Sequence, residues 1–239
     1  MIKILLKMHL VFDFDGTITV QDTMGEFAAS AVAWQQKRLG RDLRGAWDEA
    51  VRAYSADLAA VTGWDSATTL EAECRFLSSL RTVEEASLER VRRSGLLTGL
   101  GRAELFRMGG SAVAEGRVKI REGFGAVTEL AERRGWRTDV VSAHWSGAFV
   151  EGVLNGAGVT WEEEEEEDDE VECLVQGADY GIAILRPESA LVPLLSRLGL
   201  SAPAVTDMVR TRGRIGSATD FDQVLRSGLL QTLDRYVEG

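Results

Sequence analysis

The hydrophobic and polar positions divide the chain into a first strand, a long helical block and a remainder in which helices and strands alternate. Residues 8–13, MHLVFD, form a short apolar run that ends in a turn, which is typical of a buried parallel strand. From residue 22 to about residue 116 the apolar residues recur at helical spacing, with almost no strand pattern. The chain is therefore predicted to begin with one strand that leads into several helices.

The helical block contains three clear segments and further helix beyond Thr82. The segments are GEFAASAVAWQQKRL (25–39), LRGAWDEAVRAYSADLAAV (43–61) and a stretch around SATTLEAECRFLSSL (66–80). The spacing from Thr82 to Glu85 suits a capping box, in which the two side chains satisfy backbone N–H groups at a helix start. We therefore expect a helix to begin near Thr82.

After Lys119 the pattern alternates between helix and strand. GFGAVTELAERRG (123–135) predicts a helix, WRTDVVS (136–142) a strand ending at Ser142, and SGAFVEGVLNGAG (146–158) the next helix. Such β-α-β order indicates an α/β fold, a parallel sheet with helices on both faces. We predict a core domain of residues 1–21 and 117–239, with residues 22–116 inserted as a helical cap.

Composition indicates a globular protein without a targeting segment. The chain has 239 residues, 45% of them hydrophobic, enough for one domain with an insertion or for two small domains. Lys3 and Lys7 interrupt the apolar start, and no window approaches the roughly 20 apolar residues of a membrane helix. Cys74 and Cys173 fit a reducing compartment, so we expect a cytoplasmic location and no membrane contact.

The net charge of −11 comes mostly from one segment. Residues 162–170, EEEEEEDDE, carry nine negative charges, and the rest of the chain is close to neutral. Such a run repels itself and is expected to be a solvated loop, or alternatively a contact for a basic protein partner. Lysine and arginine are not clustered as in a nucleic-acid-binding surface, so no nucleic acid is expected as a partner.

Two aspartates stand at the end of the first predicted strand, in VFDFDGTIT. Ligands of open parallel sheets bind at the carboxyl ends of the strands, and Asp13 and Asp15, two residues apart on extended backbone, point to one side. Gly16 permits a sharp turn after them. Two carboxylates 4 Å apart repel each other by about 4 kcal/mol at an effective dielectric constant near 20, and a Mg²⁺ ion held by oxygen ligands relieves that repulsion.

These residues resemble a known family. VFDFDGTIT is similar to the first motif of the haloacid dehalogenase (HAD) superfamily, DxDGT, and DVVSAHWS resembles its second motif, a strand ending in Ser or Thr. The position of the helical block is similar to the cap of the phosphoserine phosphatase-like branch. The resemblance implies a HAD-like Rossmannoid sheet and a Mg²⁺-dependent phosphatase, in which Asp13 attacks phosphorus and Asp15 acts as general acid and base.

The resemblance also implies the groups that bind phosphate and metal. Gly16 and Thr17 would cradle the phosphoryl oxygens, and Ser142, followed by Ala143, would hydrogen-bond one of them. The metal ligands would be Asp13 and Asp15, the latter through its backbone carbonyl, joined by Asp220 near the C-terminus.

Three further residues are candidates for the surroundings of the site. Asp22 falls where that branch often carries an acidic group that contacts the substrate, and it is equally placed to cap the helix that follows. His144 and Trp145 follow Ser142 directly and would line the mouth of the site, although a lone histidine is more often structural.

The C-terminal third departs from the family pattern. No lysine follows Lys119, so Arg186 is the substitute for the third-motif lysine or else a surface arginine. GRIGSATDFD resembles the fourth motif but lacks the acidic residue between Gly216 and Ser217, while Asp220 matches the second aspartate of that motif, and Asp222 is nearby. Mg²⁺ affinity is therefore expected to be reduced.

Two local features accompany these departures. The stretch DMVRTRGRI is too polar for a central strand, and the chain after Asp222 is long enough for a helix but not for another strand and helix. The clustering of the departures favours a single event in this region, either degeneration or a shifted exon boundary.

The expected activity is hydrolysis of a small phosphorylated metabolite. The alternative is a catalytically impaired HAD-like protein with a binding or regulatory role, and a weaker one is phosphoryl transfer between two hydroxyl groups. Side chains of the cap that would contact a substrate cannot be placed from helical periodicity, so the substrate stays open.

Overall fold

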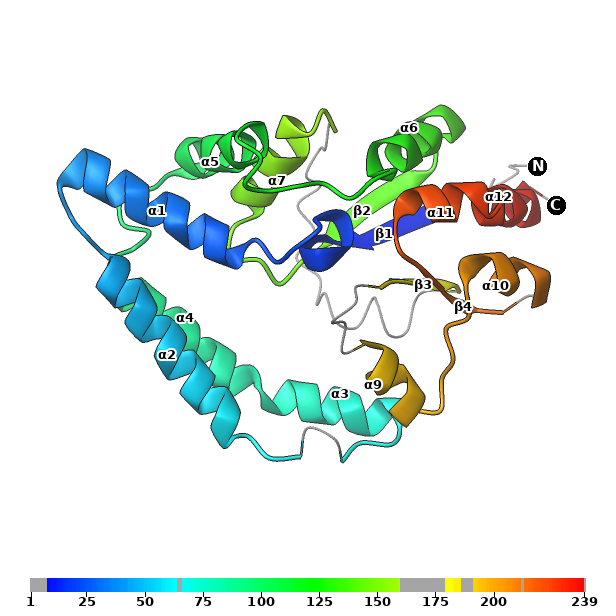
Figure 1. Cartoon of the computed structure of the whole chain (residues 1–239), viewed down its shortest axis with the longest axis horizontal. Coiled ribbons are helices and arrows are strands. Elements are labelled where there is room, and N and C mark those ends of the chain that lie inside the picture. Colours follow the sequence, from blue (N-terminus) through cyan, green and yellow to red (C-terminus); the bar gives the residue numbers. More distant parts are fainter. Residues whose placement is uncertain (1–7, 64–65, 160–178, 186–190, 212, 239) are drawn as a thin grey trace, which may run out of the picture.

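The strands form two small parallel sheets within a mixed α/β fold (Figure 1). The computed structural model describes residues 8–63, 66–159, 179–185, 191–211 and 213–238. Strand β1 (His9–Asp13) pairs with β2 (Arg137–Val141), and β3 (Gly181–Ile184) pairs with β4 (Ile215–Ala218). The expected parallel direction of these strands is confirmed, with Asp13 opposite Val141 at the carboxyl end, but the described strands form two sheets of two strands rather than one sheet.

Helices occupy the range predicted to be helical. They are α1 (Met24–Leu39), α2 (Arg44–Ala60), α3 (Leu70–Ser79), α4 (Arg81–Ser94) and α5 (Arg102–Ala114). No strand occurs among the described residues between 22 and 116, as expected. In Figure 1, α2, α3 and α4 form an arm that extends away from the β1–β2 pair.

The predicted capping box at Thr82 is wrong. Helix α4 begins at Arg81, and Leu80 precedes it without a side-chain capping bond, so Thr82 already lies in the first turn. The carboxylate of Glu85 accepts a hydrogen bond from Arg81 at 3.0 Å. An i,i+4 ion pair therefore replaces the expected contact between Glu85 and the start of the helix.

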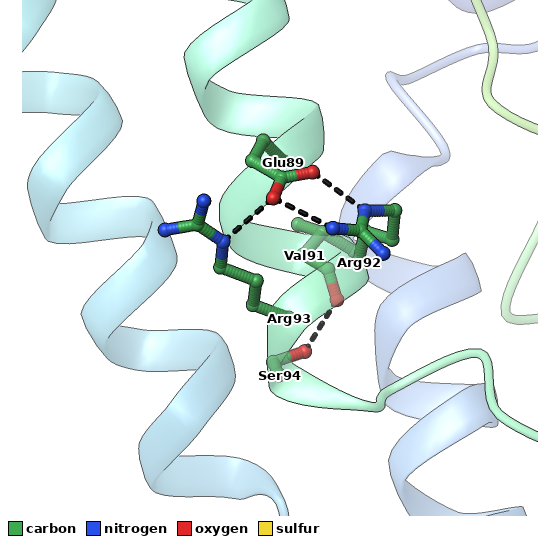
Figure 2. Close-up of polar contacts among 5 residues, drawn as sticks. All are labelled: Glu89, Val91, Arg92, Arg93 and Ser94. Atoms are coloured by element: carbon green, nitrogen blue, oxygen red, sulfur yellow. Dashed lines mark hydrogen bonds and ion pairs between the residues drawn. The ribbon is translucent and has the colours of Figure 1, made fainter.

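Exposed ion pairs cover the C-terminal turns of α4. Figure 2 shows Glu89 accepting hydrogen bonds from both Arg92 and Arg93, while Ser94 Oγ donates to the carbonyl oxygen of Val91. The bonds from Arg92 and Arg93 lower the pKa of Glu89 to about 2. These pairs contribute little to stability because both partners are solvated, but they keep this face of the arm polar.

The remaining helices surround the strands. They are α6 (Phe124–Arg134), α7 (Gly147–Gly156), α9 (Leu191–Arg197), α10 (Val205–Thr211), α11 (Phe221–Arg226) and α12 (Leu229–Glu238). The predictions of α6 and α7 are confirmed, and the polar stretch before β4 is helical at α10 rather than a buried strand. Two helices follow Asp220 where one was expected, separated by Gly228 in the left-handed conformation (φ 74°).

An aromatic cluster forms the centre of the core. Phe12 of β1 lies 5.3 Å from Phe124 and 5.8 Å from Phe221 between ring centroids, both in edge arrangements. Phe27 of α1 contacts Phe149 of α7 in the same way at 5.3 Å. The rings meet edge to face, which is the arrangement that aromatic pairs favour. The cluster therefore joins the first strand to helices from both halves of the chain.

A smaller core joins the arm to α1. Buried Ala28, Ala31, Ala50, Val91 and Leu96 come from α1, α2, α4 and the loop after α4. Gln35 of α1 is also fully buried, and its amide nitrogen donates to three carbonyl oxygens of that loop. Helix α1 is therefore shared by both cores.

Helices α5 and α7 cross at backbone contact (Figure 1). A Cβ atom on Gly152 would lie 2.0 Å from the carbonyl oxygen of Phe106, and one on Gly109 would lie 2.2 Å from that of Phe149. Only glycine fits at these points. The last helix of the predicted cap range thus packs directly on a helix of the predicted core range.

The far end of the arm touches the C-terminal half of the chain. Arg197 of α9 lies 3.2 Å from the carboxylate of Glu73 in α3 and donates to the carbonyl oxygen of Ala67 at 2.8 Å. Both side chains of the ion pair are largely buried.

No helix of the described residues is long and apolar enough to cross a membrane.

Candidate active site

A tight turn follows β1 and presents Asp13 at the surface. The turn Phe14–Ile18 is possible because Gly16 adopts φ 75° and ψ −1°, a left-handed conformation that glycine takes without strain. Phe14 and Ile18 are fully buried, whereas Asp13 is exposed. The predicted sharp turn at Gly16 is confirmed, and Phe14 anchors it in the core.

Asp13 and Ser142 lie at the same edge of the β1–β2 pair. Asp13 is opposite Val141 in the parallel register, and Ser142 is the next residue. Thr17 Oγ1 donates to Asp13 Oδ2 at 2.7 Å, and Ser142 Oγ accepts the backbone N–H of His144 at 3.1 Å. The two predicted motifs therefore meet at the carboxyl ends of neighbouring strands, with the exposed Ala143 beside them.

Asp15 is held at the start of helix α1. Its Oδ1 accepts hydrogen bonds from the backbone N–H and from the hydroxyl of Thr23, both at 2.8 Å. Burial raises the pKa of Asp15 above the ordinary aspartate value, while the two bonds from Thr23 and the nearby His144 oppose the rise and Asp22 adds to it. Because burial outweighs the hydrogen bonds, Asp15 holds its proton at a higher pH than an exposed aspartate does.

Asp22 contacts the start of α1. It is exposed, and its Oδ1 accepts the backbone N–H of Met24, the first residue of the helix, at 2.8 Å. This bond satisfies one of the N–H groups that have no partner within the helix. The negative charge of Asp22 also adds to the rise in the pKa of Asp15. A contact between Asp22 and a substrate stays a prediction.

His144 is packed against aromatic rings. Its ring stacks on Phe149 at 5.1 Å and meets the edge of Phe27 at 5.1 Å. Nδ1 accepts the backbone N–H of Ser146 at 3.1 Å, whereas the buried Nε2 has no hydrogen-bond partner among the described residues. Burial lowers the pKa of His144, which favours a neutral ring with its proton on Nε2.

Trp145 extends the contacts of this segment to the arm. It is half-buried and meets Trp47 of α2 at 6.2 Å between ring centroids, in an edge arrangement. The residues directly after Ser142 therefore contact both α7, through His144, and the arm, through Trp145.

Arg121 is a site residue that sequence reasoning missed. Its guanidinium donates to the carbonyl oxygens of Gly16 at 2.7 Å, Thr17 at 2.9 Å and Thr19 at 3.3 Å, and to that of Thr219 at 3.2 Å. One side chain thus joins the turn after β1 to the loop after β4. No local pattern singles out this arginine, because its partners are about 100 residues away on both sides.

Asp220 follows β4 and caps the next helix. Its Oδ1 accepts the backbone N–H of Gln223 in α11 at 2.7 Å, and its Oδ2 accepts the hydroxyl of Thr219 at 3.0 Å. Asp222, in the first turn of α11, forms an ion pair with Arg226 at 3.5 Å. The capping bond gives Asp220 a structural role beside its predicted metal role.

The chain is closely packed at Gly216 and Ser217, between which the fourth motif would have its acidic residue. Gly216 is buried in β4, and a Cβ atom there would lie 2.6 Å from the sulfur of Met208 in α10. The neighbouring Ser217 is also buried, and its hydroxyl donates to the carbonyl oxygen of Ala202. The two residues that flank the missing acidic position are therefore both closely packed.

The side chains of the described residues do not form a complete metal site on their own. Among the described residues, no three His, Cys, Asp or Glu side chains form a group that could hold a metal ion. Mg²⁺ often takes one or two protein carboxylates and completes its shell with water and substrate phosphate. Metal binding by Asp13 and the backbone carbonyl of Asp15 therefore stays a prediction.

Three predicted features lie outside the described residues. They are Arg186, the acidic run 162–170 and Cys173. Cys74 is described, half-buried in α3, and forms no disulfide.

Comparison of the chain with known proteins gave no match. No family model, curated protein or solved structure matches it. The function is therefore inferred from the residues themselves and from the resemblance of their two motifs.

Proposed function

We propose that this chain is a phosphomonoester hydrolase that acts through Asp13, with a HAD-like Rossmannoid core and residues 22–116 as its helical cap. The observation that carries the proposal is the placement of Asp13 and Ser142 at neighbouring carboxyl ends of β1 and β2. That edge is where open parallel sheets bind their ligands. Its substrates would be small phosphorylated metabolites in the cytoplasm.

In the first step, a carboxylate oxygen of Asp13 attacks the phosphorus atom, and the bond from phosphorus to the leaving oxygen breaks. Asp15 gives its proton to that oxygen, which departs as an alcohol, and an aspartyl-phosphate remains on Asp13. The raised pKa of Asp15 supports this role because an acid must be protonated before it can donate.

In the second step, Asp15 accepts a proton from water as the water oxygen attacks phosphorus. The bond between phosphorus and Asp13 breaks, inorganic phosphate leaves, and both aspartates return to their starting states. Ser142 and the backbone of Gly16 and Thr17 would donate hydrogen bonds to the phosphoryl oxygens during both steps.

Mg²⁺ is part of the proposal, with Asp13, the carbonyl of Asp15 and Asp220 as its protein ligands. When bound, the ion would offset the negative charge of the phosphate and the carboxylates. Since Asp220 already caps α11 and no acidic residue stands beside Gly216, we expect weak binding.

Phosphate release from a panel of small phosphomonoesters and p-nitrophenyl phosphate tests this function. We expect release that rises with Mg²⁺ up to millimolar concentrations and stops in EDTA, since weak Mg²⁺ sites require such concentrations. No release at any metal concentration, from protein shown to be folded by circular dichroism, would refute it.

The absence of an acidic residue between Gly216 and Ser217 favours a second candidate, a HAD-like binding protein without turnover. In that case the acidic run 162–170 would contribute a contact for a basic protein, and binding would weaken steeply with salt. Deletion of residues 162–170 would then abolish the salt dependence, whereas salt-independent binding would count against this candidate.

Thr23→Val should move the pH profile of hydrolysis. The substitution removes the hydroxyl that donates to Asp15, so burial acts with less opposition and the pKa of Asp15 rises further. Asp15 then stays protonated to higher pH, and the alkaline limb of kcat/KM against pH shifts upward. Thr23→Ser keeps the hydroxyl and serves as the control. An unmoved limb in Thr23→Val, or an equal shift in both variants, would contradict the role of Asp15.

A further inference from the structure

The segment that leads from α5 back to α6 passes between the two loops of the site. Arg121 N–H donates to the carbonyl oxygen of Ile18 at 2.8 Å, and the carbonyl oxygen of Glu122 accepts the N–H of Phe221 at 3.0 Å. A Cβ atom on Gly123 would lie 2.3 Å from the backbone nitrogen of Asp222. The return segment is therefore fixed by its backbone to the turn after β1 on one side and to the start of α11 on the other.

Arg121 adds a side-chain contact to both loops. Three carbonyl oxygens of the turn, those of Gly16, Thr17 and Thr19, accept hydrogen bonds from its guanidinium, and Thr219 supplies a fourth. A planar guanidinium has five N–H donors in a fixed arrangement, and an ammonium group has three on a flexible stem. Because the four acceptor oxygens lie on two separate loops, they match the five fixed donors of a guanidinium better than the three donors of an ammonium group.

The contact determines which way the peptide groups of the turn face. In a trans peptide the C=O and the following N–H point in opposite directions. Since the carbonyl oxygens of Gly16 and Thr17 face Arg121, the N–H groups of Thr17 and Ile18 face away from it. Successive N–H groups turned to one side form a concave surface that binds anions.

The contact also connects two parts that the strands leave separate. Among the described strands, β1–β2 and β3–β4 are not hydrogen-bonded to each other. Arg121 bonds to the turn after β1 and, through Thr219, to the residue directly before Asp220. This side chain therefore adds to the backbone contacts that hold the loop of Asp220 against the turn after Asp13.

We propose that Arg121 is the positioning residue of the site, which holds the turn of residues 16–19 and the loop after β4 in the arrangement needed for phosphoryl transfer to Asp13. The role rests on the proposed phosphatase function. Arg121 acts through the backbone of the turn, so its loss should disturb alignment in the transition state more than it disturbs the first binding of substrate.

The test compares Arg121→Ala and Arg121→Lys with Arg117→Ala, using p-nitrophenyl phosphate. Arg117 lies on the same return segment, but its partners are the side chains of Glu26, Ser30 and Glu115, so its removal should leave activity unchanged. For Arg121→Ala we expect kcat to fall about 100-fold, as misplacement of reacting groups by about 1 Å does, with KM changed less than about threefold. Low, non-denaturing concentrations of guanidinium should restore part of kcat in Arg121→Ala, and methylammonium should not.

Hydrogen exchange gives a readout that does not depend on turnover. The amides of residues 16–20 should exchange faster in Arg121→Ala than in the wild type, while those of α2 and α4 should not change. Should Arg121→Ala fail to fold, Arg121→Lys carries the same comparison, with a smaller loss of kcat that guanidinium does not restore.

Two failures can be told apart. A wild-type protein that releases no phosphate overturns the proposed function and this role with it. An active wild type with Arg121→Ala within threefold of its kcat, or with unchanged exchange at residues 16–20, overturns the role of Arg121 alone.

Discussion

Asp13→Asn should abolish phosphate release while the protein stays folded. An amide is not a nucleophile toward phosphorus, so the covalent step is lost. We expect kcat to fall by at least about three orders of magnitude, which corresponds to about 4 kcal/mol of activation free energy. The fold should persist because Asp13 is exposed and asparagine retains an oxygen that can accept the hydrogen bond from Thr17.

Asp139→Asn is the matched control for this variant. Asp139 lies on β2 of the same pair, but its carboxylate binds the side chains of His9 and Arg137, away from the edge that carries Asp13. Phosphate release should be unchanged in this control. If Asp13→Asn retained more than about a tenth of the wild-type rate, the nucleophile would have to be another residue.

Gly152→Ala should destabilise the protein by about 3 kcal/mol, because overpacking at a rigid contact commonly costs 1–3 kcal/mol and occasionally more. The added methyl carbon would lie 2.0 Å from the carbonyl oxygen of Phe106, and backbone in a helix has no rotamer through which to move away. Helices α5 and α7 would have to separate, and the aromatic packing around Phe149 would loosen with them. Urea unfolding at equilibrium measures the loss directly.

Gly125→Ala is the control for the glycine substitution. Gly125 lies in α6, and nothing is within 4 Å of the position its Cβ would take. Replacing a helical glycine by alanine in open space stabilises by up to about 1 kcal/mol, so this variant should be slightly more stable than the wild type. Equal stability of Gly152→Ala and wild type would show that the α5–α7 crossing is not as close as described.

Local features of the fold were predictable from the sequence. The apolar run before Asp13 and the alternation after Lys119 predicted β1, β2, α6 and α7, because these elements follow from periodicity over a few residues. Gly16 was predicted as a turn residue for the same reason, since its left-handed conformation is a property of one position.

Features that depend on distant contacts were not predictable. Arg121 and Thr219 are 98 residues apart, and nothing near either one indicates that they meet. The requirement for glycine at Gly109 and Gly152 arises only from the close approach of α5 and α7. The packing of His144 among Phe27 and Phe149 likewise depends on the arrangement of three separate segments.

The capping box at Thr82 failed for a different reason. The Thr-x-x-Glu spacing occurs often by chance, and here Arg81 offers Glu85 a charged partner one turn earlier. Helix α3 shows the true capping contact of this region, where Thr69 accepts the N–H of Ala72. The Thr-x-x-Glu motif therefore indicated the correct place for a helix start, at Arg81, but not the contact that is made there.

Trapping the covalent intermediate tests the account most directly. Acid quenching during turnover of p-nitrophenyl phosphate, followed by borohydride reduction, converts an aspartyl-phosphate to homoserine, which peptide mass spectrometry locates. We predict homoserine at position 13 in the wild type with Mg²⁺, and none without substrate. Steady phosphate release with an unmodified Asp13, or homoserine at another aspartate, would contradict the assignment of Asp13 as the nucleophile.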